Sequence, residues 1–341
     1  MNLFGEEAAP GAEEGGGSAI PSHPAGPGLA PPRAQRPLIG HVRARAVLLD
    51  MVRAGRLPHG AILAGPRGVG KATAAFALAR FLLSGGGGDA LDAPEGHPVH
   101  ARVAAGGEPD LLTIEPDAPG ATLKVDAVRA IAHFAHHTAA QAGGWRVVVV
   151  DDADAMTRAA QNALLKVLEE PPPRSIVLLV AHRPGALLPT IRSRAALVPF
   201  CALSESEMGQ VLALADPPLA AGDMPLLAAL SGGSAGRALA YAAADAPGIW
   251  ARVEPLLGRE DWPAAHALAD QMAGKAAEAA YGAFVDLVLW HLASRARAAP
   301  GDTARVAVYD ALAAHFAQVD RAALDRRHGV LGAFMLLHKA Q

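Results

Sequence analysis

A glycine-rich loop, Gly65–Lys71, constrains the fold of this chain more than any other segment. It has the pattern Gly-x4-Gly-Lys, and it lies between an apolar run, Gly60–Ala64, and a helical pattern that continues to about Ser84. In such a loop the glycines let backbone N–H groups approach phosphate oxygens, and the lysine reaches the β and γ phosphates. The segment therefore predicts a strand, a nucleotide-shaped pocket and a helix in an α/β fold.

The residue after the lysine departs from this motif. Ala72 stands where a Ser or Thr hydroxyl normally holds magnesium. Thr73 comes one residue later, and because each helical residue turns by roughly 100°, we expect its hydroxyl to face elsewhere. Weak nucleotide binding and a degenerate loop kept for packing both stay open, and magnesium-dependent hydrolysis is less expected than either. The candidate nucleotide-binding residues are Gly65, Pro66, Arg67, Gly68, Val69, Gly70, Lys71, Ala72 and Thr73.

Two aspartates follow a second apolar run. Val147–Val150 leads directly into Asp151 and Asp152, which is typical of a Walker B strand end. In an active site the first carboxylate supports magnesium and the second orients the attacking water. The alternative is that the pair only ends the strand and caps the next helix. Given the loop upstream, the pattern favours a Walker B site, and both aspartates are candidate catalytic residues.

The order of predicted elements indicates a parallel sheet with helices on both faces. We expect a helix over Val42–Ala54, further strands at Asp110–Ile114 and Ile176–Val180, and a helix that Asp126 caps. From Ser204 onward the pattern is almost purely helical. The predicted domains are a disordered tail (1–36), a nucleotide-binding-like domain (37–200), a small helical domain (201–247) and a C-terminal all-helical domain (248–341).

Composition excludes several classes of protein. The net charge of −3 gives no general attraction to nucleic acid, so any DNA contact must come from a local patch or an assembly. The only cysteine, Cys201, rules out an internal disulfide framework and fits a reducing cytosol. No apolar run is long enough to span a bilayer, and the N-terminus lacks signal-peptide features. A cytoplasmic location is therefore expected.

Three segments carry a resemblance to a known family. Asp151–Met156, Gln161–Pro172 and Ile191–Arg194 resemble the bacterial DNA polymerase III clamp loaders, which are AAA+ proteins that place a ring-shaped sliding clamp on primed DNA. The helix ending in Leu-Glu-Glu-Pro-Pro is the most specific part, and the likeness is densest over Pro37–Phe200. The resemblance implies an α/β P-loop AAA+ domain, a helical lid domain and a helical collar domain that joins subunits.

Within that family the departures resemble those of delta prime, the subunit that is not the motor. The ATPase subunits gamma and tau carry a hydroxyl after the loop lysine, a glutamate second in Walker B and a lid arginine. Here these positions hold Ala72, Asp152 and Gly236, with Arg237 displaced by one residue. The implied partners are gamma/tau and delta subunits, with the sliding clamp and primed DNA reached through the complex. The alternative is an autonomous ATPase motor of the gamma/tau kind, using Thr73 and Asp152.

The resemblance also implies roles for three cations. Arg194, in the sequence Ser193-Arg194, corresponds to an arginine that reaches a neighbouring subunit's ATP, whereas a lone arginine is otherwise expected to form a surface ion pair. Arg158 and Lys166 lie on a predicted helix where related loaders bind the DNA backbone. For each of these two, a solvated helix face is an equally good interpretation.

Two further family features are not expected here. Many clamp-loader subunits bind zinc through four cysteines after the P-loop helix, but the corresponding loop insertion, Ser84–Gly107, has only His97 and His100 as candidates. We predict no zinc, and any ATP and magnesium binding is expected to be weak or vestigial. The sensor position falls near Ala181–Arg183, where no role is assigned. No nucleotide-polymerising site is identified, so any polymerase activity would belong to the holoenzyme.

Overall fold

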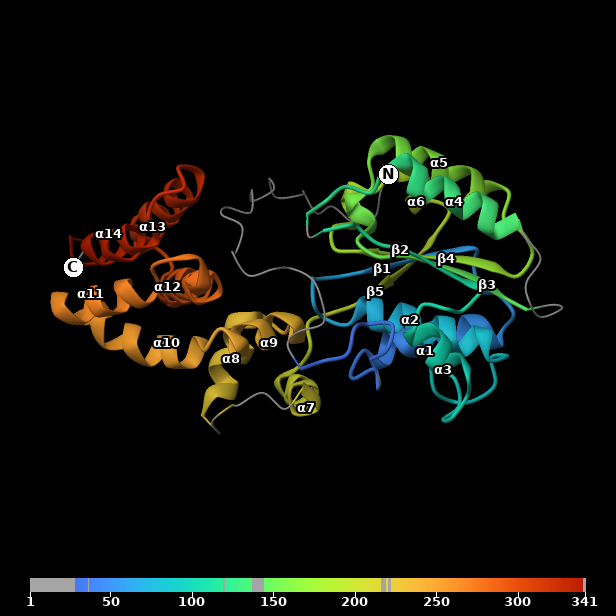
Figure 1. Cartoon of the computed structure of the whole chain (residues 1–341), viewed down its shortest axis with the longest axis horizontal. Coiled ribbons are helices and arrows are strands. Elements are labelled where there is room, and N and C mark those ends of the chain that lie inside the picture. Colours follow the sequence, from blue (N-terminus) through green and yellow to red (C-terminus); the bar gives the residue numbers. More distant parts are fainter. Residues whose placement is uncertain are drawn as a thin grey trace. The chain divides into compact units, whose positions relative to one another are not determined.

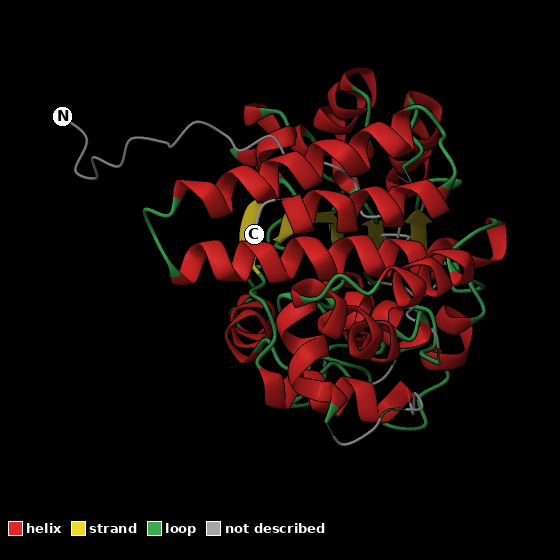
Figure 2. Cartoon of the chain, turned by 90° about the vertical axis from the view of Figure 1, so that its left-hand side faces the viewer, coloured by secondary structure: helices red, strands yellow, loops and turns green. Residues whose placement is uncertain are grey.

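The computed structural model describes residues 28–35, 37–118, 120–136, 144–215, 219 and 222–339. The described residues form two compact units that divide between Ala243 and Ala244. The first unit contains the sheet, and the second is all helical (Figures 1 and 2). Most of the predicted disordered tail, residues 1–27 and Arg36, lies outside the described residues.

A five-stranded parallel sheet forms the centre of the first unit, with the strand order β2-β3-β4-β1-β5. Each pair of neighbouring strands is parallel. This confirms the predicted α/β class, and the P-loop directly follows the inner strand β1. The edge strand β5 was not predicted. The strands are β1 (Gly60–Ala64), β2 (Leu111–Ile114), β3 (Arg146–Val150), β4 (Ser175–Ala181) and β5 (Ala196–Pro199).

Helices cover both faces of this sheet (Figure 1). In β1, Ala61 and Leu63 pack into the core cluster that includes α1, α2 and α3, whereas Ile62 and Ala64 pack into the cluster that includes α4, α5 and α6. The strands are continuous apolar runs because alternate side chains are buried on opposite faces. The helices are α1 (Val42–Arg53), α2 (Lys71–Leu83), α3 (Val99–Ala104), α4 (Val125–His136), α5 (Arg158–Glu169) and α6 (Pro189–Arg192), with 3-10 turns at Ala153–Ala155 and Pro184–Ala186.

Three local expectations need correction. The insertion predicted as a loop contains the helix α3, whose Val99 and Val103 are buried. Asp126 does not cap α4 but lies inside its first turn, where it pairs with Arg129 at 2.9 Å. Order also begins before residue 37, since Arg33 binds Glu115 at 2.8 Å.

Three more helices complete the first unit, α7 (Glu205–Ala215), α8 (Asp223–Ser231) and α9 (Ala235–Ala243). The helix pairs α7·α9 and α8·α9 are in contact. They occupy the region predicted as a small helical domain. Among the described residues, no helix is long and apolar enough to cross a membrane.

The second unit is a helical bundle with an aromatic centre. Phe284 of α12 lies 6.1 Å from Phe316 of α13 and 6.0 Å from Phe334 of α14, measured between ring centroids. All three rings are buried, so one aromatic side chain from each long helix joins the others. The helices are α10 (Ala246–Val253), α11 (Trp262–Gln271), α12 (Glu278–Ala298), α13 (Thr303–Arg321) and α14 (Arg326–Lys339), with 3-10 turns at Glu254–Gly258 and Lys275–Ala277.

Candidate nucleotide site and surface arginine

A cavity of about 140 Å³ lies at the P-loop. Its polar side chains come from Gln35, Lys71, Thr73, Asp151 and His182, and most of the remaining lining residues are apolar. Six of the nine predicted nucleotide-binding residues, 68–73, line it, including both Ala72 and Thr73. The apolar side chains that contribute are Leu29, Ala30, Pro32, Pro37, Leu38, Ile39, Val180, Leu203, Val211, Leu214 and Ala235.

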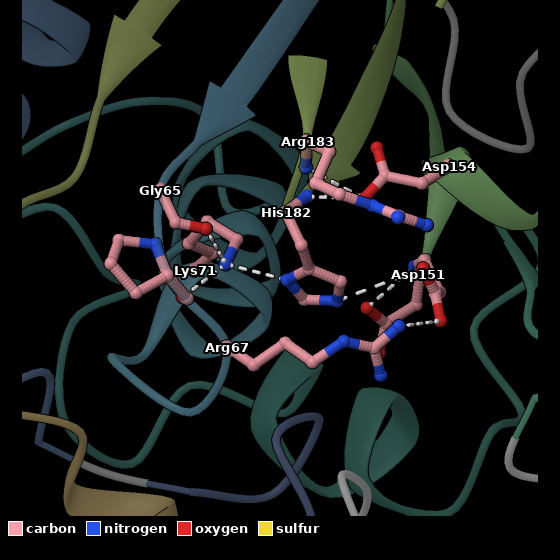
Figure 3. A network of polar contacts seen from close by, with 9 residues as sticks. Gly65, Arg67, Lys71, Asp151, Asp154, His182 and Arg183 are labelled. Atoms are coloured by element: carbon pink, nitrogen blue, oxygen red, sulfur yellow. Dashed lines mark hydrogen bonds and ion pairs between the residues drawn. The ribbon is translucent and has the colours of Figure 1, made fainter. Parts of the chain in front are cut away.

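Lys71 is almost completely buried, with 3% of its surface exposed. Its Nζ donates to the backbone oxygens of Gly65 at 2.6 Å and Pro66 at 2.5 Å, and it lies 2.8 Å from Nδ1 of His182 (Figure 3). Burial lowers the pKa of Lys71 to about 8, although Asp154 and Asp151 oppose this shift. The loop lysine is thus held by the chain's own atoms.

The second Walker B candidate is also paired within the site. Asp152 has a positive φ of 53°, and its Oδ2 accepts from Nη2 of Arg67 at 2.9 Å. The Asp152 side chain is buried, and its Oδ1 lies 3.7 Å from Nε2 of His182. Asp151 is buried as well, and its Oδ1 accepts from the backbone N–H of Asp152 at 3.0 Å. The carboxylate of Asp152, which would face a water or a metal in an active site, is therefore paired with the P-loop residue Arg67.

Asp154, two residues further on, fixes the end of β4. Its Oδ2 accepts from the backbone N–H groups of His182 at 2.6 Å and Arg183 at 2.8 Å (Figure 3). This contact joins the acidic turn after β3 to the residue that touches Lys71. His182 is the site residue that sequence reasoning missed, because no role was assigned to the position after the strand predicted at Ile176–Val180.

The first turn of α9 packs directly on the P-loop. The backbone N–H of Gly236 donates to the Gly68 oxygen at 3.0 Å. The next residue, Arg237, does not take the place of the missing lid arginine, because its Nη2 donates to the Tyr241 hydroxyl at 2.6 Å. Gly236 thus brings the backbone of the α9 segment against the loop, and Arg237 is engaged within its own helix.

These residues do not fit a magnesium–triphosphate complex. Ala72 supplies no oxygen to a metal, Lys71 is fully engaged, and Asp152 is paired with Arg67. The apolar lining suits an uncharged ring system better than a chain of phosphates. In the part of the chain that the structure describes, no group of three or more His, Cys, Asp or Glu side chains could hold a metal ion.

Arg194 lies on the surface, just after α6. Its Nη2 pairs with Oε1 of Glu169 at 3.0 Å, and the two side chains are 39% and 48% exposed. Its Nη1 also donates to the Thr190 oxygen at 3.2 Å. The ion pair expected of a lone surface arginine is therefore present, and its partner belongs to the Leu-Glu-Glu-Pro-Pro segment.

The two candidate DNA-binding cations lie on α5. Thr157 caps this helix, since its Oγ1 accepts from the backbone N–H of Ala160 at 3.2 Å. Arg158 and Lys166 are both exposed, whereas the apolar positions of the same helix, among them Leu164, are buried in the core. The helix therefore turns its cations toward solvent.

Comparison with protein families gives a match to the family described as "DNA polymerase III, delta subunit", over residues 40–204. The DNA polymerase III subunit delta' of Pseudomonas aeruginosa is 40% identical over 180 residues, which are 52% of this chain and 53% of that protein. The corresponding protein of Escherichia coli is 38% identical over 156 residues, 44% of each chain. The matches thus span about half the length of these curated relatives.

Proteins named DNA polymerase III subunit gamma/tau are also similar to this chain. The DNA polymerase III subunit gamma/tau of Mycobacterium tuberculosis is 33% identical over 183 residues, which are 52% of this chain and 30% of that protein. Among solved structures, a DNA polymerase III gamma subunit-related protein from Thermotoga maritima is similar, with a TM-score of 0.46 and 18% identity. That likeness covers 86% of this chain and 99% of the Thermotoga chain.

Proposed function

We propose that the chain is a non-motor clamp-loader subunit of the delta prime kind that helps to load the sliding clamp onto primed DNA. The support is the family match over residues 40–204 and the similarity to proteins named DNA polymerase III subunit delta'. In this role it supplies Arg194 to the ATP site of a neighbouring gamma or tau subunit. The proposed partners are gamma/tau and delta, with the clamp and DNA reached through the assembly. The second unit, from Ala244 on, is proposed to join the subunits.

One observation carries this proposal: the site's own cations are paired internally, whereas Arg194 is exposed. Lys71 and Arg67 are bound to groups of the chain itself. Arg194 is held by Glu169 in a pair that is open to water, and such pairs contribute only about 0–1 kcal/mol. The guanidinium can therefore exchange Glu169 for a phosphate oxygen at little cost.

An arginine suits this role for chemical reasons. During transfer of a phosphoryl group, negative charge spreads over its oxygens, and a guanidinium from a neighbouring chain can stabilise that charge. Its planar fork of donors matches phosphate geometry, while lysine offers only a point charge. An autonomous ATPase is supported less well, because Lys71 and Asp152 are both engaged and Ala72 lacks the hydroxyl.

The test is ATP turnover by the reconstituted loader that contains full-length Arg194→Ala. We expect clamp-stimulated hydrolysis to fall, since an arginine supplied in trans is worth about 10³–10⁵ in kcat at the site it serves. Arg194→Lys should restore little of it. Arg192→Ala is a matched control, because Arg192 is also an exposed arginine at the end of α6. Unchanged hydrolysis in Arg194→Ala would defeat the proposal.

A further inference from the structure

His182 occupies a fixed place beside the P-loop. It directly follows β4, and its side chain is only 9% exposed. Asp154 accepts from its backbone N–H and from that of Arg183, so the ring is held where Nδ1 lies 2.8 Å from Lys71 Nζ (Figure 3). Nε2 of the same ring faces Asp152 Oδ1 at 3.7 Å. The imidazole therefore lies between the loop lysine and Asp152.

The donors of Lys71 are fully used by this arrangement. An ammonium group has three N–H donors, and Lys71 has three acceptors, which are the oxygens of Gly65 and Pro66 and Nδ1 of His182. Two of these acceptors are backbone atoms of the loop itself. The third is a side chain that comes from another strand, so it is the contact that depends on residue type.

A phosphate oxygen must displace one of these acceptors to reach Lys71. With 3% of its surface exposed, the lysine has almost no contact with solvent through which a further acceptor could approach. Arg67, the other cation of the loop, is paired with the buried Asp152. Arg67 is thus paired with a carboxylate, and all three N–H donors of Lys71 are already taken by neutral acceptors in the folded chain.

We propose that His182 closes the phosphate position of this P-loop to nucleoside triphosphates by holding Lys71. His182 is thus a specificity-determining residue of the pocket. Lys71 and His182 both line the cavity at the P-loop, so the contact between them lies where a phosphate would have to reach the lysine. This inference concerns the chain's own pocket and does not depend on the role of Arg194 in an assembly.

The test is a fluorescence titration of the isolated full-length chain with magnesium and N-methylanthraniloyl-ATP. We expect His182→Ala to bind this probe at least about tenfold more tightly than the wild type, because one charge-assisted hydrogen bond to Lys71 becomes available to phosphate. The gain should disappear in His182→Ala/Lys71→Ala. His59→Ala is the matched control, because His59 precedes β1 at the opposite end of the strand from the P-loop and contacts the Ser175 oxygen.

His182→Phe keeps an aromatic ring and removes the acceptor nitrogen, so it should show the same gain in affinity for the probe. It also keeps the proposal testable if His182→Ala fails to fold. Thermal unfolding monitored by circular dichroism identifies the folded variants. Unchanged affinity in folded His182→Phe would overturn the proposal. So would a gain in His182→Ala alone, since that would assign the effect to side-chain volume. Tight binding of the probe by the wild type would also contradict it.

Discussion

Lys71 carries its charge in a place that water hardly reaches. An exposed lysine loses its proton near 10.5, but burial lowers the pKa of Lys71 to about 8. The carboxylates of Asp154 and Asp151 oppose the shift without cancelling it. The same residue that would bind phosphate in an active P-loop therefore costs stability here at neutral pH, because the folded state disfavours its charged form.

This cost has a testable pH dependence. The pKa of Lys71 is lower in the folded chain than in the unfolded chain, so the unfolded chain binds more protons between about pH 8 and 10.5. Stability from this group therefore increases as pH rises through that window. Relative to Lys71→Met, the wild type should gain about 2 kcal/mol in free energy of unfolding between pH 7.5 and 9.5. Urea titrations at both pH values measure the difference.

A second variant without a titrating group separates this effect from packing. Lys71→Gln should show the same pH trend, even though its stability at any one pH differs from that of Lys71→Met. A difference between wild type and both variants that stays constant from pH 7.5 to 9.5 would contradict the lowered pKa.

The insertion after α2 shows how a buried ion pair can anchor an irregular segment. Arg80, which is 1% exposed, donates through Nε and Nη2 to the two carboxylate oxygens of Asp92 at 2.7 and 2.9 Å. Its Nη1 also donates to the Arg33 oxygen at 3.0 Å. One guanidinium therefore connects α2, the insertion and the segment before α1.

Removing the carboxylate should destabilise the first unit strongly. In Asp92→Ala the Arg80 guanidinium loses its charge partner while it stays buried, and such a loss typically costs about 3–5 kcal/mol. Asp89→Ala is the matched control in the same insertion, since Asp89 pairs with Arg53 but is fully exposed. We expect no measurable change for that control. Urea unfolding followed by circular dichroism compares the two, and equal stabilities would show that the pair does not anchor the insertion.

At the scale of elements, the local sequence pattern predicted the strands correctly where both faces of the strand are buried. The runs Gly60–Ala64 and Val147–Val150 were predicted as strands because every residue is apolar or small, and both lie inside the parallel sheet. The helix α3 escaped prediction because it is short and follows a glycine-rich stretch. Its Val99 and Val103 are buried by tertiary packing, which no local periodicity reveals.

The candidate site was likewise predicted from the sequence only in part. Motif spacing located the P-loop and the aspartates, since these signals are contiguous in sequence, and the family resemblance singled out Arg194. The contacts within the site depend instead on residues that are far apart in the sequence, because His182 and Lys71 are separated by 111 positions. Spacing also could not reveal that Arg67 pairs with Asp152. Sequence therefore indicated which residues form the site, and the structure showed that they bind one another.

At the scale of the whole molecule, charge limits how the chain can meet DNA. Its net charge of −3 provides no overall attraction to a polyanion, so a local surface must supply it. The exposed side of α5 presents Arg158 and Lys166, while its apolar side is buried against the core. We propose that these two cations contact phosphates when the chain acts within a clamp loader.

Counterion release makes this proposal measurable in the assembled complex. Each phosphate that a cation neutralises adds about 0.9 to the slope of log affinity against log salt concentration. A loader containing Arg158→Ala/Lys166→Ala should therefore bind primed DNA more weakly at low salt, with a slope that is smaller by up to about 2. Lys124→Ala/Arg129→Ala removes the same charge from an exposed surface at α4 and should leave the slope unchanged. Equal slopes for the α5 variant and the wild type would mean that Arg158 and Lys166 form a solvated helix face and do not contact DNA phosphates. Because the contacts are to the backbone, the loss should be the same for any primer sequence.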